Sequence, residues 1–500
     1  MPVETPHPSY NDSVNKWNRC RHTANGSDAV KDSKTLYLPM LEKQDVLEYD
    51  AYRMRAMFFG ATGRTVQGLL GAVFRKDFNI QYPEYLINQL ESITPTSMEL
   101  KDFARKVVYE QLVVGRVGIL VDADKENSDV INASIYTAEN IVNWKTKRSN
   151  GKESLTLVVL RETYEGKTND VYESKQKEQY RVLSFGLTEK GESSAYMQTV
   201  WRKREGGESN NASSFMMVSE ETVVPRIRGV AMDHIPFYFI NAESLSSAVV
   251  KPPLLDLVDV NLSHYRTSAD LEHGAHYTAL PTAWLAGFTT DGSKEFRIGS
   301  ATAWVSEEIG ATAGFLEFKG QGLESLRNLK KDKEQLMAVL GARMLEEQKK
   351  AVEAADTHRL RQSGESGALT TIADTASEGI ENVLQMIARW SGASEAQIEA
   401  IKFDLNTDFA SARMTPQELT SLMQAWQGGA MSQDTFLHNL KQGEILPDGR
   451  TIEEEKDLIA VEAPSGGVTE DEMNNIIPIK RNFKVVKNGD NSISVSEGDD

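Results

Sequence analysis

The sequence contains little cysteine, no long hydrophobic run and no excess of positive charge. Its 500 residues include one cysteine, Cys20, which excludes a disulfide within the chain and a zinc site built from several cysteines. The longest nearly uncharged apolar stretch, Ala279–Phe288, is far too short to span a bilayer, and no charged-then-apolar signal opens the chain. We therefore expect no membrane partner, and assembly in a cytoplasm.

The net charge also argues against most DNA-binding proteins. It is −18, whereas nucleic-acid binders usually carry a basic footprint. A channel through which DNA slides is a different case, because such a wall should not hold phosphates tightly. The acidic balance therefore favours solubility and leaves a DNA conduit open.

Familiar catalytic motifs are missing. The sequence has no G-x-x-x-x-G-K-[ST] phosphate loop and no H-E-x-x-H, and Gly364–Gly367 is not a G-x-S-x-G nucleophile elbow. Because catalytic groups also assemble across distant sequence, each absence is weak alone. Together they predict that the chain is not an enzyme and needs no cofactor.

Three weaker chemical candidates remain. The first is a helical histidine pair beside two acids, the second a thiol beside a histidine, and the third an acidic pair at a strand end. In order, they are His273 and His276 near Asp270 and Glu272, Cys20 near His22, and Asp122 with Asp124. They could indicate a metal site, an activated thiol and a metal-dependent nuclease, respectively. Packing histidines, an inert thiol and turn acids are the more common interpretations, and we expect no metal.

The first half of the chain predicts helices followed by an α+β block. The polar stretch to about Lys34, which includes Trp17, is typical of a surface arm. Apolar residues recur at helical spacing over 44–75, interrupted by glycines. Thr96–Glu99 has a capping-box pattern that predicts a helix ending near Gly115. Strands are predicted at Gly118–Val121, Ile131–Ile135, Leu155–Leu160, Tyr180–Phe185, Met197–Trp201 and Pro236–Ile240.

The second half predicts two long helices around a small β unit. Pro252-Pro253 opens the first helix, and the second covers about Leu323–Lys350. The β unit has predicted strands at Thr282–Leu285, Thr302–Val305 and Phe315–Phe318. A polar loop and a third strong helix follow. Short capped helices then begin near Thr415, Ser432 and Thr451, and Asn488–Asp500 is predicted to be disordered.

The order of these parts and several short stretches carry a resemblance to a known family. The strand motif is Pro236–Asn241, and the helix opening that follows it is Leu254–Asn261. In the same way, Ser363-Gly364 precedes the helix from Ala368. The other stretches are Trp17–Arg21, Tyr37–Pro39, Gly429–Thr435, Leu446–Asp448 and Glu453–Glu455. Over about residues 10–465 the chain resembles the portal proteins of tailed bacteriophages, the head-tail connectors. No single motif among these is diagnostic of the family.

This resemblance implies an α+β fold of wing, stem, clip and crown that assembles as a ring. The implied parts are 1–98, the N-terminal helical part of the wing; 99–251, the α+β wing; 252–278, the first stem helix; 279–321, the β-rich clip; 322–352, the second stem helix; 353–367, the tunnel loop; 368–392, a long wing helix; 393–465, the helical crown; and 466–500, an acidic flexible tail.

The resemblance also implies the positions of functional residues. The stem residues facing the channel would be Asp256, Asp259, Asp270, Lys330, Lys331 and Lys333. We expect these lysines to pair with acids of a neighbouring subunit rather than to touch DNA. The tunnel-loop residues that would contact phosphates without reading bases are His358, Arg359, Arg361, Gln362 and Ser363. Clip residues suited to an interface are Trp284, Phe288 and Trp304. For the tunnel-loop residues, the alternative is a plain solvent loop. For the clip residues, the alternative is the core of a small β unit.

The implied function is a channel, usually a dodecamer, at the capsid vertex through which double-stranded DNA is packaged and ejected. The implied partners are further copies of the chain, double-stranded DNA bound without sequence specificity, the terminase large subunit, the major capsid and scaffolding proteins, and the head-tail adaptor. The terminase motor would supply the ATPase. The implied location is the portal vertex of the virion, after assembly in the host bacterial cytoplasm.

Three other functions stay open. The chain could be another structural virion or adaptor protein, although a shell subunit would not need a projection of two helices. It could be a metal-dependent nuclease, which predicts cleavage that depends on Asp122 or Asp124. A cellular scaffold unrelated to phages would form no ring.

Overall fold

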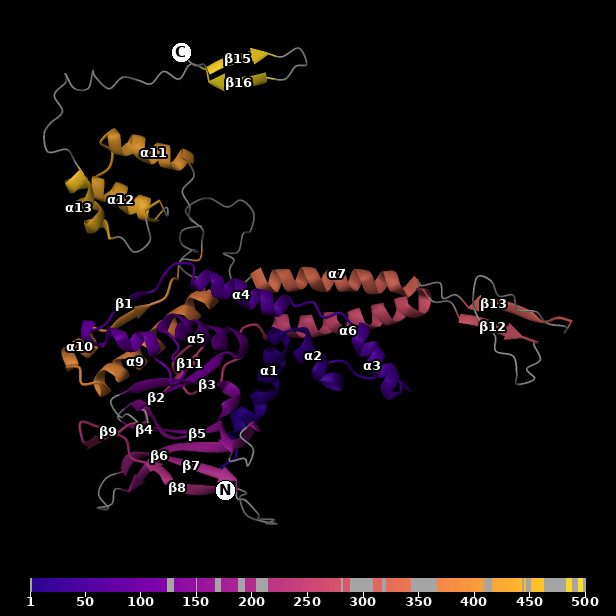
Figure 1. Ribbon diagram of the computed structural model, residues 1–500, viewed down its shortest axis with the longest axis horizontal. Coiled ribbons are helices and arrows are strands. Elements are labelled where there is room, and N and C mark those ends of the chain that lie inside the picture. The colour runs from indigo at the N-terminus through magenta and orange to yellow at the C-terminus, as the bar shows by residue number, and fades with distance from the viewer. Residues whose placement is uncertain are drawn as a thin grey trace. The chain divides into compact units, whose positions relative to one another are not determined.

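The computed structural model describes most of the chain and divides it into two compact units, Met1–Phe409 and Ala410–Asp500. The described residues are 2–123, 130–149, 151–166, 172–187, 194–203, 215–279, 282–287, 309–316, 321–342, 367–407, 409, 416–442, 445–446, 451–462, 483–487 and 493–497. Helices and strands are mixed along them (Figure 1), which confirms the predicted α+β class. None of the described helices is long and apolar enough to cross a membrane.

The N-terminal region is a packed set of helices, so the predicted surface arm is wrong. It forms α1 (Pro8–Asn25), α2 (Ser27–Asp32), the short 3-10 helix η1 (Lys34–Leu36), α3 (Val46–Arg55) and α4 (Ala61–Val73). Trp17 is completely buried, and Cys20 lies beside it in the main core. The polar composition of α1 misled the prediction because its few apolar residues all lie on one buried face.

The helix predicted over 44–75 is two helices. Asp45 and Glu48 form a capping box that begins α3. The chain leaves helical geometry after Arg55 and resumes it after Gly60, the residue that precedes α4. The glycines at 63, 68 and 71 that seemed to interrupt the helix lie inside α4. Of the four glycines in the pattern, only Gly60 therefore lies at the break between the two helices.

α5 (Leu100–Val114) and a three-stranded antiparallel sheet form the centre of the first unit. The sheet has the order β11-β2-β3, with β2 at Arg116–Ala123, β3 at Ile131–Thr137 and β11 at Phe237–Asn241. The predicted capping box at Thr96 is wrong, because Glu99 is the N-cap and makes no side-chain cap. The predicted end is confirmed: Gly115 takes the left-handed conformation that glycine favours.

A five-stranded antiparallel sheet forms the outer layer of the first unit. Its strands run in sequence order: β4 (Ile141–Ser149), β5 (Lys152–Gly166), β6 (Lys175–Leu187), β7 (Ser194–Lys203) and β8 (Phe215–Val223). The predicted strands correspond to β5, β6 and β7. The two edge strands, β4 and β8, were missed because charged residues interrupt their apolar alternation. The remaining short elements are β1 (Asn79–Gln81), η2 (Glu84–Ser92), η3 (Ala138–Asn140), β9 (Arg226–Ile227) and β10 (Val230–Ala231).

The long helix α9 (Gly367–Trp390) packs against β11 and α5 with a continuous buried face. Residues 393–409, which the sequence grouped with the C-terminal helices, also belong to the first unit. Here α10 (Glu395–Glu399) is followed by β14 (Lys402–Asp404), which pairs with β1. Phe403 is buried in the main core beside Phe78, 5.0 Å between ring centroids. The boundary between the units therefore lies near 409 rather than near 393.

The described residues of the second unit form three short helices and a β-hairpin. The helices are α11 (Pro416–Gln427), α12 (Gln433–Gln442) and α13 (Ile452–Glu462), around a small core of Phe436, Leu437 and Leu440. The predicted caps at Ser432 and Thr451 are confirmed, since each side-chain oxygen accepts a backbone N–H three residues on. The predicted disorder after residue 488 is wrong in part, because β16 (Ile493–Glu497) pairs with β15 (Phe483–Lys487).

Candidate functional site: a helical hairpin with an inserted β-hairpin

Two long helices and a two-stranded sheet make up the candidate site. They are α6 (Leu255–Ala279), β12 (Thr282–Ala286), β13 (Thr312–Leu316) and α7 (Gln321–Ala342), in that order along the chain. Figure 1 shows α6 and α7 lying side by side, and they pack against each other along their length. The predicted stem-helix regions and two of the three predicted β strands thus correspond to real elements. The third predicted strand, 302–305, lies outside the described residues.

α6 is anchored in the core of the first unit. The Asn261 side chain is completely buried, and its Oδ1 accepts hydrogen bonds from the N–H and the hydroxyl of Thr62, at 3.2 and 2.9 Å. Its Nδ2 donates to the carbonyl of Phe59 at 2.7 Å. A buried amide with all these partners is costly to remove. Asn261 therefore fixes α6 against the start of α4.

Polar contacts also join α7 to α6. Nε2 of the fully buried His264 lies 3.1 Å from Oε1 of Glu334. Lys333 donates to the carbonyl of Ser263 at 3.3 Å and to the hydroxyl of Thr267 at 2.6 Å. Burial lowers the pKa of His264, although Glu334 opposes that shift. These contacts fix the register of the helices but leave most of α7 exposed.

The predicted channel acids each have a partner in their own chain. Oδ1 of Asp256 is 2.7 Å from the Lys251 ammonium. Asp259 pairs with the Arg19 guanidinium at 3.1 Å. Asp270 accepts a hydrogen bond from the Tyr52 hydroxyl at 2.6 Å. Contacts of these acids with a neighbouring subunit stay a prediction.

The three predicted stem lysines differ in their surroundings. Lys333 is held by α6, and its pKa is lowered by burial and by Arg266. Lys330 is half-buried and Lys331 is exposed. Neither of these two has a hydrogen-bond or ion-pair partner within the described part of the chain. Of the three predicted stem lysines, Lys330 and Lys331 are therefore the two still available for a partner within the described part of the chain.

The β-hairpin exposes two aromatic residues. β12 and β13 pair so that Trp284 lies opposite Gly314. A Cβ at Gly314 would come within 2.9 Å of the indole Nε1, so the Trp284 ring lies close against the glycine. Trp284 is 44% exposed and Phe315 is 52% exposed. The predicted clip residues Phe288 and Trp304, and the tunnel-loop residues 358–363, lie outside the described residues.

The weaker chemical candidates gain little from their surroundings. The Cys20 thiol is buried, which raises its pKa to about 12 and contradicts an activated thiol. Oδ1 of Asp122 accepts the N–H of Ala123 at 3.0 Å, and Asp124 lies outside the described residues. Nδ1 of His273 is 3.3 Å from an Arg55 nitrogen. Within the described ranges no group of three His, Cys, Asp or Glu side chains could hold a metal ion.

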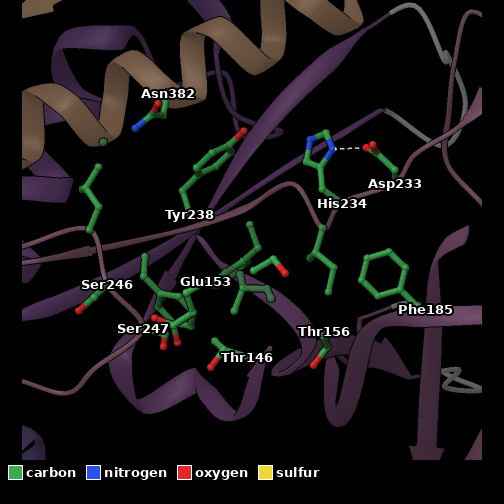
Figure 2. Close-up of a pocket in the computed structure, with 17 residues that line it drawn as sticks. Thr146, Glu153, Thr156, Phe185, Asp233, His234, Tyr238, Ser246, Ser247 and Asn382 are labelled. Atoms are coloured by element: carbon green, nitrogen blue, oxygen red, sulfur yellow. Dashed lines mark hydrogen bonds and ion pairs between the residues drawn. The ribbon is translucent and has the colours of Figure 1, made fainter. Parts of the chain in front are cut away.

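A surface pocket of about 530 Å³ lies between β5, β11 and α9 (Figure 2). At one edge, Nδ1 of His234 is 2.8 Å from Oδ1 of Asp233, which lowers the pKa of that carboxyl. Burial raises the pKa of Tyr238 to about 12. Figure 2 shows Tyr238 between Asn382 and His234. The Asp233–His234 pair is exposed to solvent at the edge of the pocket.

Sequence reasoning missed the residues that hold the hairpin together. Asn261, His264 and Glu334 are polar residues on long helices, where polar side chains usually face solvent. Their only signal was a polar residue at a position that helical spacing places on the buried side. That signal cannot be read without knowing which neighbour covers each side of α6.

Comparisons with known proteins give one family and several structures. A family described as Domain of unknown function (DUF4055) matches residues 253–391, and no curated protein matches. Similar solved structures include the neck of a native GTA particle computed with C12 symmetry, with 10% identity over 77% of this chain and 91% of that chain and a TM-score of 0.36. The neck of an empty GTA particle computed with C6 symmetry is 12% identical over 79% of this chain and 93% of that chain, with a TM-score of 0.36. A chain from the virion of a native gene transfer agent (GTA) particle is 11% identical over 82% of this chain and 95% of that chain, with a TM-score of 0.37.

The family match covers the whole candidate site, from just before α6 to the end of α9. It spans fewer than half of the residues and its description names no function. The chain is thus similar in its central region to a family without an assigned activity.

Proposed function

We propose that this chain is a portal subunit, which forms a ring around a channel for double-stranded DNA at the capsid vertex of a tailed phage. The observation that carries the proposal is the α6–α7 hairpin. One of its helices is embedded in the core through Asn261, the other is largely exposed, and a β-hairpin is inserted between them. A helix pair of this kind can line a channel while the core of the subunit stays outside it.

The charges of α7 suit the inner wall of such a channel. Lys330 and Lys331 lie on the same helix as Glu324 and Asp332, so positive and negative side chains are interspersed. A wall of mixed charge gives only weak, salt-sensitive contacts with phosphates. DNA could then move along it without being held. The tunnel-loop residues His358, Arg359 and Arg361 would provide the closest DNA contacts.

The β-hairpin is the proposed docking site for the packaging motor and later for the tail adaptor. Trp284 and Phe315 present aromatic surface to solvent, and aromatic residues are enriched in protein interfaces. In this proposal the terminase large subunit supplies ATP hydrolysis. The chain itself would be no enzyme.

Experiments can separate the portal role from two of the alternative functions that the sequence left open. Another structural virion protein would assemble without a channel. A metal-dependent nuclease would depend on Asp122 or Asp124, and the Asp122 carboxylate accepts a backbone hydrogen bond from Ala123. Incubation of the protein with double-stranded DNA and Mg²⁺ or Mn²⁺ should give no cleavage. Cleavage that Asp122→Asn abolishes would establish the nuclease instead.

Negative-stain images of the purified full chain test the proposal. We expect rings with a central hole, together with a mass of many subunits by light scattering. If the protein stays monomeric, co-expression with the phage's scaffolding protein should produce the rings. A closed dimer or tetramer without a hole, or no ring even with the scaffold, would overturn the portal assignment.

A further inference from the structure

The five-stranded sheet β4–β8 has an apolar outer face. Side chains alternate between the two faces of a strand, and one set, which includes Val158 and Leu160, lies in the main core of the first unit. The other set forms a separate apolar cluster around Val142, Val159 and Tyr180. The outer face of an antiparallel sheet is usually polar, so an apolar outer face is a surface that something should cover.

The first residues of the chain lie on this face, and we call Pro2–His7 the N-terminal strap. The carbonyl of Thr5 accepts a hydrogen bond from the Asn143 side chain at 2.9 Å. The N–H of His7 donates to the carbonyl of Val142, also at 2.9 Å. Both partners belong to β4, the edge strand of the sheet. Figure 1 marks the N-terminus of the chain beside β7 and β8.

The N-terminal strap closes one side of an apolar cavity of about 720 Å³. Pro2 and Val3 line the cavity from the strap, and Leu157 and Trp201 are among the side chains that line it from the sheet. Val3 also packs against the outer cluster. Moving the strap would therefore expose apolar surface of the sheet while the main core on the opposite face stays covered.

His7 fixes the inner end of the strap through its side chain. It is the N-cap of α1, and its Nδ1 accepts the N–H of Ser9 at 3.1 Å. A backbone N–H can only donate, so Nδ1 must carry a lone pair and the proton of the neutral ring must be on Nε2. A second proton can be added only at Nδ1. Protonation of His7 therefore removes the side-chain cap of α1.

The His7 ring also shares an aromatic partner with a buried cation. Its imidazole stacks on the indole of Trp144, with 4.2 Å between the ring centroids and 20° between the planes. The guanidinium carbon of Arg116 lies 4.0 Å from the same indole, and Arg116 is completely buried. An imidazolium at His7 would thus bring a second cation to the ring that Arg116 already occupies.

The other charges around His7 do not offset this repulsion. Besides Arg116, the charged side chains nearest to it on the strap, α1, η3, β4 and β5 are Glu4, Asp12, Glu139, Lys145 and Arg161. Glu139 is paired with Arg21 at 2.6 Å, Asp12 is exposed, and Glu4 moves with the strap. Burial lowers the pKa of His7, and Arg116 lowers it further. The N-terminus of a helix also disfavours a cation.

We propose that the N-terminal strap is an acid-released cover, closed over the outer face of the sheet while His7 is neutral and opened when His7 takes up a proton. Protonation at Nδ1 removes the cap of α1 and places a cation beside Arg116. Opening exposes the apolar cavity and frees the edge of β4 at Val142. The device is independent of the proposed ring, because all of these contacts lie within one chain.

The sign and the range of the pH response follow from the two states. The closed strap binds a proton at His7 less readily than the open strap, because the pKa of His7 is lowered from its ordinary value of 6.5 only when the strap is closed. Closure is therefore favoured at neutral pH, and this advantage is lost as the pH falls through about 6.5. One linked proton changes the ratio of closed to open strap by at most about tenfold per pH unit.

Thiol labelling of the full chain tests the device. Val3→Cys places a thiol on the strap, whereas Cys20 is buried and should stay unreactive. The rate of reaction with 4,4′-dithiodipyridine is divided into that of a free peptide with the sequence of residues 1–7 and the same substitution, measured at the same pH. This ratio is the protection by the strap. We expect protection at pH 7.5 that falls by about five- to tenfold at pH 5.5.

Matched variants in the Val3→Cys background assign the response to one imidazole. His7→Asn keeps an oxygen that caps a helix well but takes up no proton, so its protection should be equal at the two pH values. His7→Phe keeps a ring for Trp144 but has no acceptor, and its strap should be open at both. His438→Asn, at an exposed site in the second unit, should keep the full fall.

The outcomes decide between a strap that opens and other causes. A fall in protection that His7→Asn abolishes and His438→Asn retains would support the proposal. Equal protection of the wild-type strap at pH 7.5 and 5.5, or a fall of the same size in His7→Asn, would overturn it. Labelling of Cys20 that rises together with that of the strap would also overturn it, because the whole subunit would then be opening. An open strap in His7→Asn at pH 7.5 would contradict the role of the cap.

Discussion

Nε2 of His264 on α6 lies 3.1 Å from Oε1 of Glu334 on α7, and the imidazole is completely buried. Burial lowers the pKa of His264, with Lys330 and Lys333 acting in the same direction and Glu334 opposing them. The neutral imidazole therefore belongs to the folded state. This pair makes the junction of the two stem helices sensitive to acid.

The first prediction is that acid weakens the folded protein through His264. The unfolded imidazole binds a proton more readily than the folded one, so this contribution to stability is present at neutral pH. It is lost as the pH falls through about 6.5, the ordinary pKa of histidine. The fall is at most about 1.4 kcal/mol per pH unit for one linked proton. We expect His264→Gln to reduce the loss of thermal stability between pH 7.5 and 5.5.

The control for this prediction is the exposed His438. His438→Gln should keep the wild-type pH dependence. The pKa values of His7, His22 and His273 are also lowered, so part of the slope will persist in the His264 variant. Identical slopes for wild type and His264→Gln would show that the buried imidazole does not contribute.

The second prediction contrasts two helical glycines. A Cβ at Gly379 of α9 would collide with the Ile240 side chain of β11, which is completely buried. Gly379→Ala should therefore destabilise the protein by about 1–3 kcal/mol through overpacking. A Cβ at Gly68 of α4 would meet nothing within 4 Å, so Gly68→Ala should stabilise by about 0.5–1 kcal/mol. Denaturant unfolding of both variants measures the two changes in the free energy of unfolding. Changes of the same sign would contradict the close approach of α9 to β11.

The third prediction concerns the buried Arg116. Its guanidinium carbon is 4.0 Å from the Trp144 ring and 4.2 Å from the Phe239 ring. Its hydrogen bond goes to the Ser247 carbonyl at 3.1 Å, and burial lowers its pKa to about 9. Arg116→Lys should cost about 1–3 kcal/mol, because an ammonium cannot stack as a plane between two rings. Arg116→Met should cost less, because it removes the buried charge.

The control for Arg116 is Arg202, which stacks on Tyr164 at 4.2 Å in a partly exposed position. Arg202→Lys should change the free energy of unfolding by less than about 1 kcal/mol. Should Arg116→Met prove more harmful than Arg116→Lys in chemical denaturation, the charge itself would be required and the ranking above would be wrong.

The fourth prediction concerns the β-hairpin. Trp284→Ala should leave ring assembly and thermal stability unchanged but remove binding of the terminase large subunit in a pull-down. Tyr85→Ala is the control, because Tyr85 is 60% exposed and lies on η2, outside the hairpin. Unchanged terminase binding by the Trp284 variant would remove the hairpin from the docking role.

Much of the second half of the fold could be predicted from the sequence. Pro252-Pro253, the stripes of the two stem helices and the caps at Ser432 and Thr451 all act through local geometry, which sequence records directly. The errors have a common cause in tertiary contacts. Trp17 looked exposed because the helices that bury it are distant in sequence, and 393–409 joined the first unit because β14 pairs with β1, more than 300 residues earlier.

The site was predictable at the level of elements but not of side chains. Helical periodicity indicated a two-helix hairpin around a β unit, and α6, β12, β13 and α7 confirm it in the described residues. The same periodicity could not tell that Tyr52 would engage Asp270 or that Lys333 would be held by Thr267. Those contacts depend on the angle at which separate helices meet, which side-chain spacing along one helix does not determine.

The most direct test of the central claim is an electron cryomicroscopy map of the assembled protein. We predict a ring in which α6 and α7 of every subunit surround a central channel, with Lys331 accessible from the lumen or its rim. The loop over 353–367 should face the same channel. A ring with the helical hairpin on its outer surface, or an assembly with no channel, would contradict the account.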